Sequence, residues 1–198
     1  MHLPKTAGMA LRLFLGNQYA VSQILPAFGW PELLSVDFSR IEEYRLFQGH
    51  FSCSLLDLLP KDVAPIVFLR EPVARTISHL KHLRRDPNFH PAHQLAAGRT
   101  LDDLVRDERV MKLCCDSQCA LLSYDVPGDS ILADLRRVQS EGRAANPDAF
   151  AAKPDLAKAE AMLDRFAFVG FVEHLQDDVM RLSMNRLPPA ARNPQTQP

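Results

Sequence analysis

Apolar positions along this chain follow two different patterns. In several segments they recur three and four residues apart, which predicts amphipathic helices. In others they form short continuous runs, which are typical of strands buried on both faces of a parallel sheet. Helices are predicted over residues 7–19, 73–83, 111–122, 156–166 and 173–187 with another starting at Thr100, and strands over residues 44–51, 64–69 and 168–171.

Turn and capping residues divide these segments. Pro72 is suited to the first position of a helix, Ser52 to capping a short helix over residues 54–59, and Thr100 with Asp103 to a capping box. Proline and glycine predict connections at residues 24–39 and 142–154. The polar residues 84–98 predict a long loop, either a functional lid or a disordered segment.

The order of these elements predicts a single α/β domain. Strand, turn and helix occur twice in succession, which is the rhythm of a central parallel sheet flanked by helices. We expect the domain to span residues 1–187 and the aperiodic residues 188–198 to form a loosely ordered tail. The first strand is expected to be truncated, because only Met1, His2 and Leu3 precede Pro4.

Composition narrows the class of protein. The 198 residues are 46% hydrophobic and carry a net charge of −1, so no general attraction to nucleic acid is expected. No apolar run is long enough to predict a transmembrane segment, and the start lacks the regions of a signal peptide. A composition rich in Ala, Arg and Pro suggests a bacterial cytoplasmic protein, with a Golgi-lumenal catalytic fragment as the alternative.

Cysteine and histidine spacing predicts no metal site. Three of the four cysteines, Cys114, Cys115 and Cys119, fall in one predicted helix, where Cys115 and Cys119 would share a face. Buried thiols are the favoured interpretation over a metal or redox role. The histidine pairs 79/82 and 90/93 have helical spacing, but neither has an evident third ligand.

The first ten residues have the pattern of a strand end, a tight turn and a helix start. A helix N-terminus offers free backbone N–H groups and the positive end of the helix dipole, which suits an anion such as phosphate. Lys5 adds a positive charge, and Ala7 and Gly8 leave room for the ligand. The alternative is that Lys5 is a solvated residue of a surface turn.

Further polar residues follow the other predicted strands. Ligands of open parallel sheets bind beyond the carboxyl ends of the strands, where Lys5, His50 and Arg70 are all expected. Two basic residues there indicate a ligand with more than one phosphate, and Ser78 lies eight residues beyond Arg70. The alternative for His50 is a hydrogen-bonded core histidine, and for Arg70 it is a structural ion pair with Glu71 or another acid. The alternative for Ser78 is a plain helical serine. The basic residues Lys81, Arg84 and Arg85 suggest a solvated face or a surface that steers an acidic sugar.

These segments resemble those of sulfotransferases that use PAPS (3′-phosphoadenosine 5′-phosphosulfate). His-Leu-Pro-Lys-Thr-Ala-Gly at residues 2–8 is similar to their 5′-phosphosulfate loop, and residues 68–78 are similar to their 3′-phosphate motif, including the spacing from Arg70 to Ser78. Gln-Gly-His-Phe at residues 48–51 resembles a segment of the carbohydrate branch, to which heparan-sulfate 2-O-sulfotransferase belongs; residues 116–118 and 168–173 also have counterparts there. The resemblance spans about residues 2–185 and implies a P-loop-like domain.

The resemblance also implies roles for individual residues. Lys5 and His50 would be catalytic, Lys5 neutralising the 5′-phosphate as the sulfuryl group leaves and His50 acting as general base toward a hydroxyl of a carbohydrate or glycolipid acceptor. The residues expected to bind PAPS, and its product adenosine 3′,5′-bisphosphate, are Lys5, Thr6, Ala7, Gly8, Met9, Arg70 and Ser78. No metal is implied.

Two alternatives remain at this stage. Met9 and Ala10 stand where the family usually has hydroxyl residues, which suggests a catalytically inactive domain that binds a nucleotide or a glycan. A P-loop nucleotide kinase is the less favoured alternative, because the first turn lacks the pattern Gly-x4-Gly-Lys-Ser/Thr.

Overall fold

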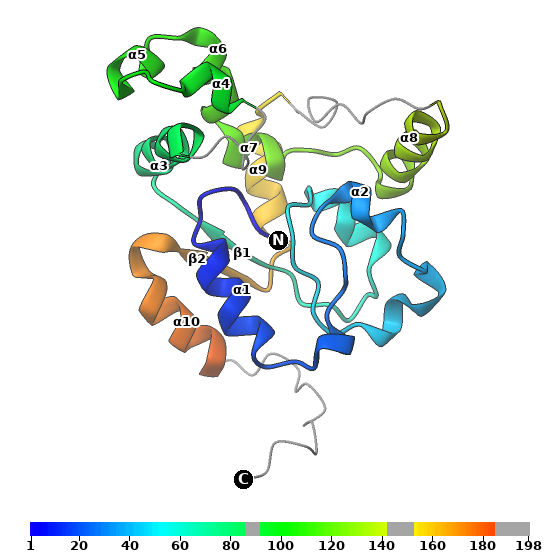
Figure 1. Ribbon diagram of the computed structural model, residues 1–198. Helices are drawn as coiled ribbons and strands as arrows, with labels where there is room; N and C mark the ends of the chain where they lie inside the picture. Colours follow the sequence, from blue (N-terminus) through cyan, green and yellow to red (C-terminus); the bar gives the residue numbers. More distant parts are fainter. Residues whose placement is uncertain (86–91, 142–152, 185–198) are drawn as a thin grey trace.

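The computed structural model describes residues 1–85, 92–141 and 153–184 and is a mixed α/β structure, mostly helical (Figure 1). Its helices are α1 (Gly8–Gly16), α2 (Trp30–Leu33), α3 (Pro72–Arg85), α4 (His93–Ala96), α5 (Leu101–Val105), α6 (Glu108–Cys114), α7 (Ser117–Leu122), α8 (Gly128–Ser140), α9 (Leu156–Leu163) and α10 (Leu175–Met184). Short 3₁₀ helices cover Val21–Gln23, Phe38–Glu43, Cys53–Leu58 and Val172–His174. None of these described helices is both long and apolar enough to cross a membrane.

Two strands, β1 (Ile66–Leu69) and β2 (Phe168–Phe171), pair in parallel, with Ile66 opposite Phe168 and Leu69 opposite Phe171. These strands confirm the predictions for residues 64–69 and 168–171. The strand predicted over residues 44–51 is not formed; that segment makes only isolated parallel bridges, Ile24 to Leu46 and Gly29 to His50. The described residues therefore contain a two-stranded sheet rather than the larger central sheet that the sequence predicts. The neighbouring segment includes Pro26, which has no N–H to extend a ladder.

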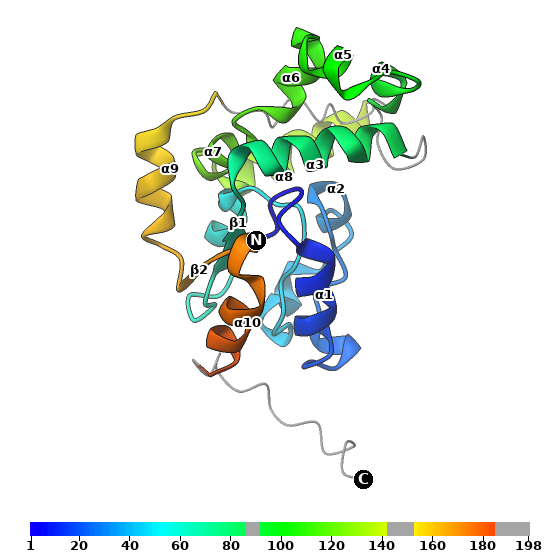
Figure 2. The same cartoon turned by 90° about the vertical axis from the view of Figure 1, so that its left-hand side faces the viewer.

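The two faces of β1 pack against different helices. Phe68 is 2% exposed and shares a core cluster with Leu15 of α1 and Leu182 of α10. Val67, on the opposite face, is fully buried in a cluster with Leu122 of α7 and Ala159 of α9. Figure 2 shows α1 and α10 next to each other below α3.

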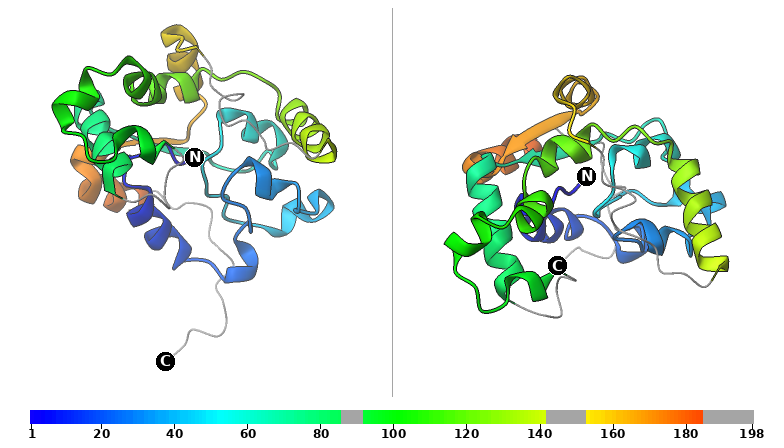
Figure 3. Two further views of the ribbon diagram at one scale, coloured as in Figure 1. Left: turned by 45° about the horizontal axis from the view of Figure 1, so that its top comes forward. Right: turned by 90° about the horizontal axis from the view of Figure 1, so that it is seen from above.

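A separate core joins α2 to α8. It contains Trp30 and Leu33 of α2 together with Ile131, Leu132 and Leu135 of α8. Viewed from above, this half lies opposite the half that contains α3 to α6 (Figure 3). The sequence prediction missed α8, although its apolar residues have helical spacing.

The predicted helix over residues 111–122 is wrong, because α6 and α7 are separate. Asp116 separates the two helices, because its backbone adopts the left-handed region with φ 48°. The break places the Gln118 side chain on the backbone of Arg70 at the end of β1, with Gln118 Oε1 2.9 Å from Arg70 N and Gln118 Nε2 2.8 Å from Arg70 O. Cys115 therefore follows the end of α6 as its C-cap, whereas Cys119 lies within α7. Cys115 is exposed, contrary to the buried thiol expected there.

Other boundaries also differ from the predictions. The first helix ends at Gly16, and the segment predicted as a loop over residues 84–98 includes the end of α3 and all of α4. The short helix predicted over residues 54–59 is present as the 3₁₀ helix Cys53–Leu58, but the Ser52 side chain makes no capping hydrogen bond. Residues 86–91, most of the 142–154 connection and the predicted tail lie outside the described residues.

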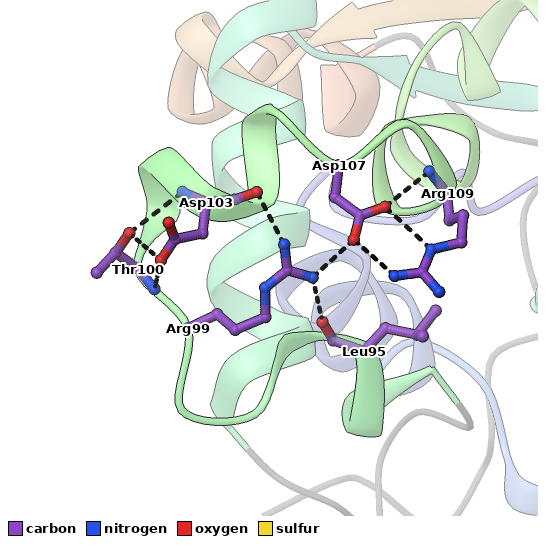
Figure 4. Close-up of polar contacts among 6 residues, drawn as sticks. All are labelled: Leu95, Arg99, Thr100, Asp103, Asp107 and Arg109. Carbon is purple, nitrogen blue, oxygen red and sulfur yellow. Dashed lines mark hydrogen bonds and ion pairs between the residues drawn. The ribbon is translucent and has the colours of Figure 1, made fainter.

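The helices α4, α5 and α6 are joined by a network around Arg99 and Thr100 (Figure 4). Arg99 Nη1 donates to the carbonyl of Leu95 at 2.9 Å and to Asp107 Oδ2 at 2.8 Å, and its Nη2 donates to the carbonyl of Asp103 at 3.0 Å. The predicted capping box is confirmed: Asp103 N donates to Thr100 Oγ1 at 3.2 Å, and Thr100 N donates to Asp103 Oδ2 at 3.0 Å.

This capping box gives a testable prediction. Thr100→Ala removes the hydroxyl that accepts the Asp103 N–H, so we expect the free energy of unfolding to fall by about 1 kcal/mol. Thr100→Ser keeps the hydroxyl and is the matched control, with a loss less than half as large. Urea denaturation measures both variants, and equal stabilities would contradict the capping role.

Candidate functional site

The N-terminal loop, residues 2–7, lies at the centre of the candidate site. Leu3 is fully buried and packs in the same cluster as Val67 of β1. The buried Thr6 hydroxyl donates to the carbonyl of Leu3 at 2.8 Å and closes the turn. Lys5 (φ 72°) and Ala7 (φ 60°) both adopt the left-handed region. Because this conformation costs on the order of 1 kcal/mol for a residue with a side chain, the surrounding packing must hold it.

Helix α1 begins at the end of this loop without an acidic neighbour. Its N-cap, Ala7, makes no side-chain hydrogen bond, and its first turn contains no acidic residue. The positive end of the helix dipole is therefore not neutralised by the helix's own side chains. Met9 and Ala10 are exposed in this first turn.

Gly8 is required by a close approach of His2. A Cβ atom at position 8 would lie 1.6 Å from Nε2 of the His2 ring. The same ring lies 4.2 Å, centroid to centroid, from the ring of His50. Only glycine therefore lets the N-terminal loop pack between the start of α1 and His50.

Arg70 lies at the carboxyl end of β1, beside the N-terminal loop. The pair of hydrogen bonds from Gln118 fixes its backbone, and its Nη1 donates to the carbonyl of Lys5 at 3.3 Å. Its Nε is buried and has no hydrogen-bond partner among the residues that the structure describes. A buried donor without an acceptor costs about 1–3 kcal/mol, so this nitrogen marks a position where an acceptor is missing.

The predicted alternative, an Arg70–Glu71 ion pair, does not occur within the described part of the chain. The Glu71 carboxylate instead accepts from the backbone N–H groups of Val73 at 2.9 Å and Ala74 at 2.6 Å, where it caps α3. These hydrogen bonds lower the pKa of Glu71. The Arg70 guanidinium group instead donates to the carbonyl of Lys5 in the loop.

Lys5 lies in a cationic environment. The pKa of its ammonium group is lowered, first by burial and then by the positive charges of Arg85, Arg70 and Arg75. Besides burial, every group responsible for this shift is a cation. An anion bound between them would relieve their mutual repulsion.

Arg75 is a buried cation beside the N-terminal loop that the sequence analysis did not include among the candidate site residues. It is only 2% exposed, and its guanidinium group donates to the carbonyl of Pro4 at 3.3 Å and to the carbonyl of Cys114. Figure 2 shows α3, which carries Arg75, lying across the N-terminal loop. The available signal was helical spacing: Arg75, His79 and Leu83 are four residues apart and share the buried face of α3.

Ser78 lies on α3 as predicted, but the structure does not join it to Arg70. It is half-buried on α3, three residues after Arg75, and so lies on the side of the helix that faces the loop. No hydrogen bond joins Ser78 to Arg70 among the described residues. The structure therefore joins Lys5 and Arg70 by a hydrogen bond. Ser78 lies on the neighbouring helix α3 without a hydrogen bond to either of them among the described residues.

His50 is exposed and oriented by the N-terminal loop. Its Nδ1 lies 3.1 Å from the carbonyl oxygen of His2. Because a carbonyl oxygen only accepts, Nδ1 carries the proton and Nε2 keeps its lone pair. The ring of Phe28 meets His50 edge-on, with a centroid distance of 5.0 Å. The alternative of a histidine hidden in the core does not hold, because the ring reaches the surface.

Both histidines are held neutral near pH 7. His50 is exposed as a whole residue, but the rings of His2 and Phe28 pack against its imidazole and partly bury it, which lowers the pKa of His50. Its hydrogen bond to the His2 carbonyl acts in the opposite direction. The pKa of His2 falls to about 3, because of burial and the nearby positive charge that His50 would carry. His50 is therefore available as a proton acceptor at neutral pH.

In the part of the chain that the structure describes, no group of three or more His, Cys, Asp or Glu side chains is placed to hold a metal ion. Comparison with known proteins does not assign the site: no family model matches the chain, and neither the curated proteins nor the solved structures include a significant match.

The contact between Gly8 and His2 gives a prediction. Gly8→Ala places a methyl group inside the His2 ring, so we expect the free energy of unfolding to fall by about 2 kcal/mol. Adding His2→Ala removes the obstructing ring and should restore about half of the loss. Gly16→Ala is the control, because nothing lies near its Cβ position. Equal effects at positions 8 and 16 in thermal denaturation would contradict the close approach.

Proposed function

We propose that this protein transfers a sulfuryl group from PAPS to a hydroxyl group of a carbohydrate or glycolipid acceptor. The proposal includes a P-loop-like arrangement, in which the N-terminal loop and the start of α1 bind the 5′-phosphosulfate. The observation that carries it is the buried Nε of Arg70, which has no hydrogen-bond partner among the described residues. The same guanidinium group contacts the carbonyl of Lys5 through Nη1. It is supported by the motif resemblance of residues 2–8, 48–51 and 68–78.

The anion-binding part of the proposal rests on charge. Lys5, Arg70 and Arg75 lie close enough for the two arginines to depress the pKa of Lys5. Among the described residues, the hydrogen-bond acceptors of the two guanidinium groups are the backbone carbonyls of Lys5, Pro4 and Cys114, which carry no full negative charge. A donor with phosphates at both the 3′ and 5′ positions supplies the acceptors that this arrangement lacks.

Each residue of the loop would have a defined task. The backbone N–H groups of residues 6–9 would bind the 5′-phosphate at the N-terminus of α1. The Lys5 ammonium group would neutralise the bridging oxygen as negative charge develops on it. Arg70, with Ser78 on the adjacent side of α3, would bind the 3′-phosphate.

His50 would act as the general base. Its Nε2 would take the proton of the acceptor hydroxyl while the hydroxyl oxygen forms a bond to sulfur. The bond between sulfur and the bridging oxygen breaks in the same step, and adenosine 3′,5′-bisphosphate leaves. The hydrogen bond from Nδ1 to the His2 carbonyl orients the ring and stabilises the imidazolium that forms.

A catalytically inactive domain that binds a nucleotide is the second candidate. Met9 and Ala10 provide no hydroxyl donor in the first turn of α1 and are exposed there, which favours it. Both candidates predict nucleotide binding, and they differ in whether His50 supports transfer.

Nucleotide binding tests the first step. In calorimetry we expect the wild-type protein to bind adenosine 3′,5′-bisphosphate, and Arg70→Gln to weaken the binding about 10- to 100-fold because charge-assisted hydrogen bonds are lost. Arg137→Gln is the matched control, because Arg137 lies on α8 in an exposed pair with Asp134. Absence of binding by the folded wild-type protein, or equal losses in the two variants, would refute the assignment.

Sulfate transfer and its pH dependence test the second step. We expect His50→Ala to reduce the transfer rate about 100-fold or more while nucleotide affinity is kept. In the wild-type protein, kcat/KM should fall on acidification with a midpoint below 6.5, the ordinary histidine value, because the pKa of His50 is lowered. An unchanged rate in His50→Ala would remove His50 from the mechanism. Binding without any transfer by the wild-type protein would favour the inactive domain.

A further inference from the structure

The end of β1 is held by side chains where a neighbouring strand would otherwise hold it. Leu69 lies opposite Phe171, the last residue of β2, and Val172 then opens a 3₁₀ helix. No residue of β2 is therefore left to pair with Arg70. The Gln118 side chain takes that place: its Oε1 accepts from Arg70 N at 2.9 Å, and its Nε2 donates to Arg70 O at 2.8 Å.

The next residue along the chain is held in the same way. Glu71 N donates to Glu173 Oε1 at 3.0 Å, and Glu173 belongs to the 3₁₀ helix that follows β2. Both peptide N–H groups between β1 and Pro72, the first residue of α3, are thus bonded to side chains. Because an amide offers a donor and an acceptor, Gln118 satisfies both backbone groups of Arg70, as a strand neighbour would.

The α6–α7 corner, residues 114–118, contacts Arg75 as well. In one continuous helix the carbonyl of Cys114 would accept the N–H of Gln118, four residues further on. Asp116 interrupts the helix with φ 48°, and the Cys114 carbonyl accepts instead from the buried guanidinium group of Arg75. The interruption therefore leaves one carbonyl for Arg75 and places Gln118 against the end of β1.

These contacts fix the point from which the Arg70 side chain extends. Its Nη1 reaches the carbonyl of Lys5 at 3.3 Å, while its buried Nε has no acceptor among the described residues. A guanidinium group that is already oriented loses less side-chain freedom when it binds an anion. The hydrogen bonds from Gln118 should therefore strengthen anion binding, although Gln118 itself is engaged with the backbone.

We propose that the α6–α7 corner is the positioning element of the anion site and that Gln118 is the positioning residue that directs Arg70 toward the 3′-phosphate of the nucleotide. The inference rests on the function proposed above, because that function assigns Arg70 to this phosphate. Gln118 acts through the backbone of Arg70, and the Cys114 carbonyl holds Arg75 beside it. Figure 2 shows α7, which carries Gln118, beside the start of α3.

A double-mutant cycle on nucleotide affinity tests this role. Gln118→Met keeps the length of the side chain and removes both strong hydrogen bonds, so we expect the affinity for adenosine 3′,5′-bisphosphate to fall about tenfold. In the Arg70→Gln background the same substitution should change the affinity by no more than about twofold, because its effect passes through Arg70. Gln139→Met is the matched control, because Gln139 is exposed on α8.

A signal of the free protein separates the positioning role from the proposed function. The Arg70 Nε–H is buried, so it should give a slowly exchanging resonance in the wild-type protein. Gln118→Met should speed its exchange with solvent about tenfold, because the guanidinium group is no longer held in one place. Gln139→Met should leave this exchange unchanged. The measurement needs no nucleotide.

Two substitutions at Asp116 test the corner itself. Asp116→Gly adopts the left-handed region without a steric penalty, so nucleotide affinity should not fall. Asp116→Val strongly disfavours this region and should lower the affinity about five- to tenfold, because the corner no longer presents Gln118 to Arg70. Equal affinities of these two variants would show that the conformation of the corner does not serve the site.

Three further results would overturn the proposal. The first is wild-type nucleotide affinity in Gln118→Met. The second is an equal loss from this substitution with and without Arg70→Gln, since Gln118 would then not act through Arg70. The third is unchanged exchange of the Arg70 Nε–H. If the wild-type protein binds no nucleotide but Gln118→Met still speeds this exchange, the proposed function is refuted and the positioning of Arg70 is supported.

Discussion

Four consecutive backbone carbonyls, those of residues 2–5, each accept a hydrogen bond from a side chain. The donors are His50 to His2, Thr6 to Leu3, Arg75 to Pro4 and Arg70 to Lys5. Three of these donors lie 48 to 71 residues further along the chain. The N-terminal loop therefore orients the proposed base, the cation at the end of β1 and the buried cation of α3 together.

This arrangement has an electrostatic consequence. Arg70 and Arg75 are bound to carbonyl oxygens, which orient a guanidinium group but do not cancel its charge. The one carboxylate next to Arg70 in sequence, Glu71, is instead engaged in capping α3. The positive charge consequently remains concentrated around Lys5, although the chain as a whole carries a net charge of −1. A local cluster of cations thus coexists with a nearly neutral protein.

The same loop ties the site to the rest of the structure. Leu3 anchors it in the cluster that contains β1, α7 and α9, and His2 packs against Gly8 at the start of α1. Gln118 of α7 holds Arg70, so the break between α6 and α7 also serves the site.

Local patterns in the sequence determined both strands and several helix starts of this protein. The continuous apolar runs indicated both β1 and β2, and Pro72 and the Thr100–Asp103 pair marked helix starts correctly, because these signals act within a few residues. The same patterns indicated Lys5, His50 and Arg70 as residues following predicted strands.

Tertiary structure alone decided the rest. The helix pattern across residues 111–122 gave way at Asp116 because Gln118 satisfies the backbone of Arg70, and the segment 44–51 failed to form a strand because it lacks a long partner. Arg75 became part of the site because burial left its guanidinium group only the carbonyls of distant segments to bind.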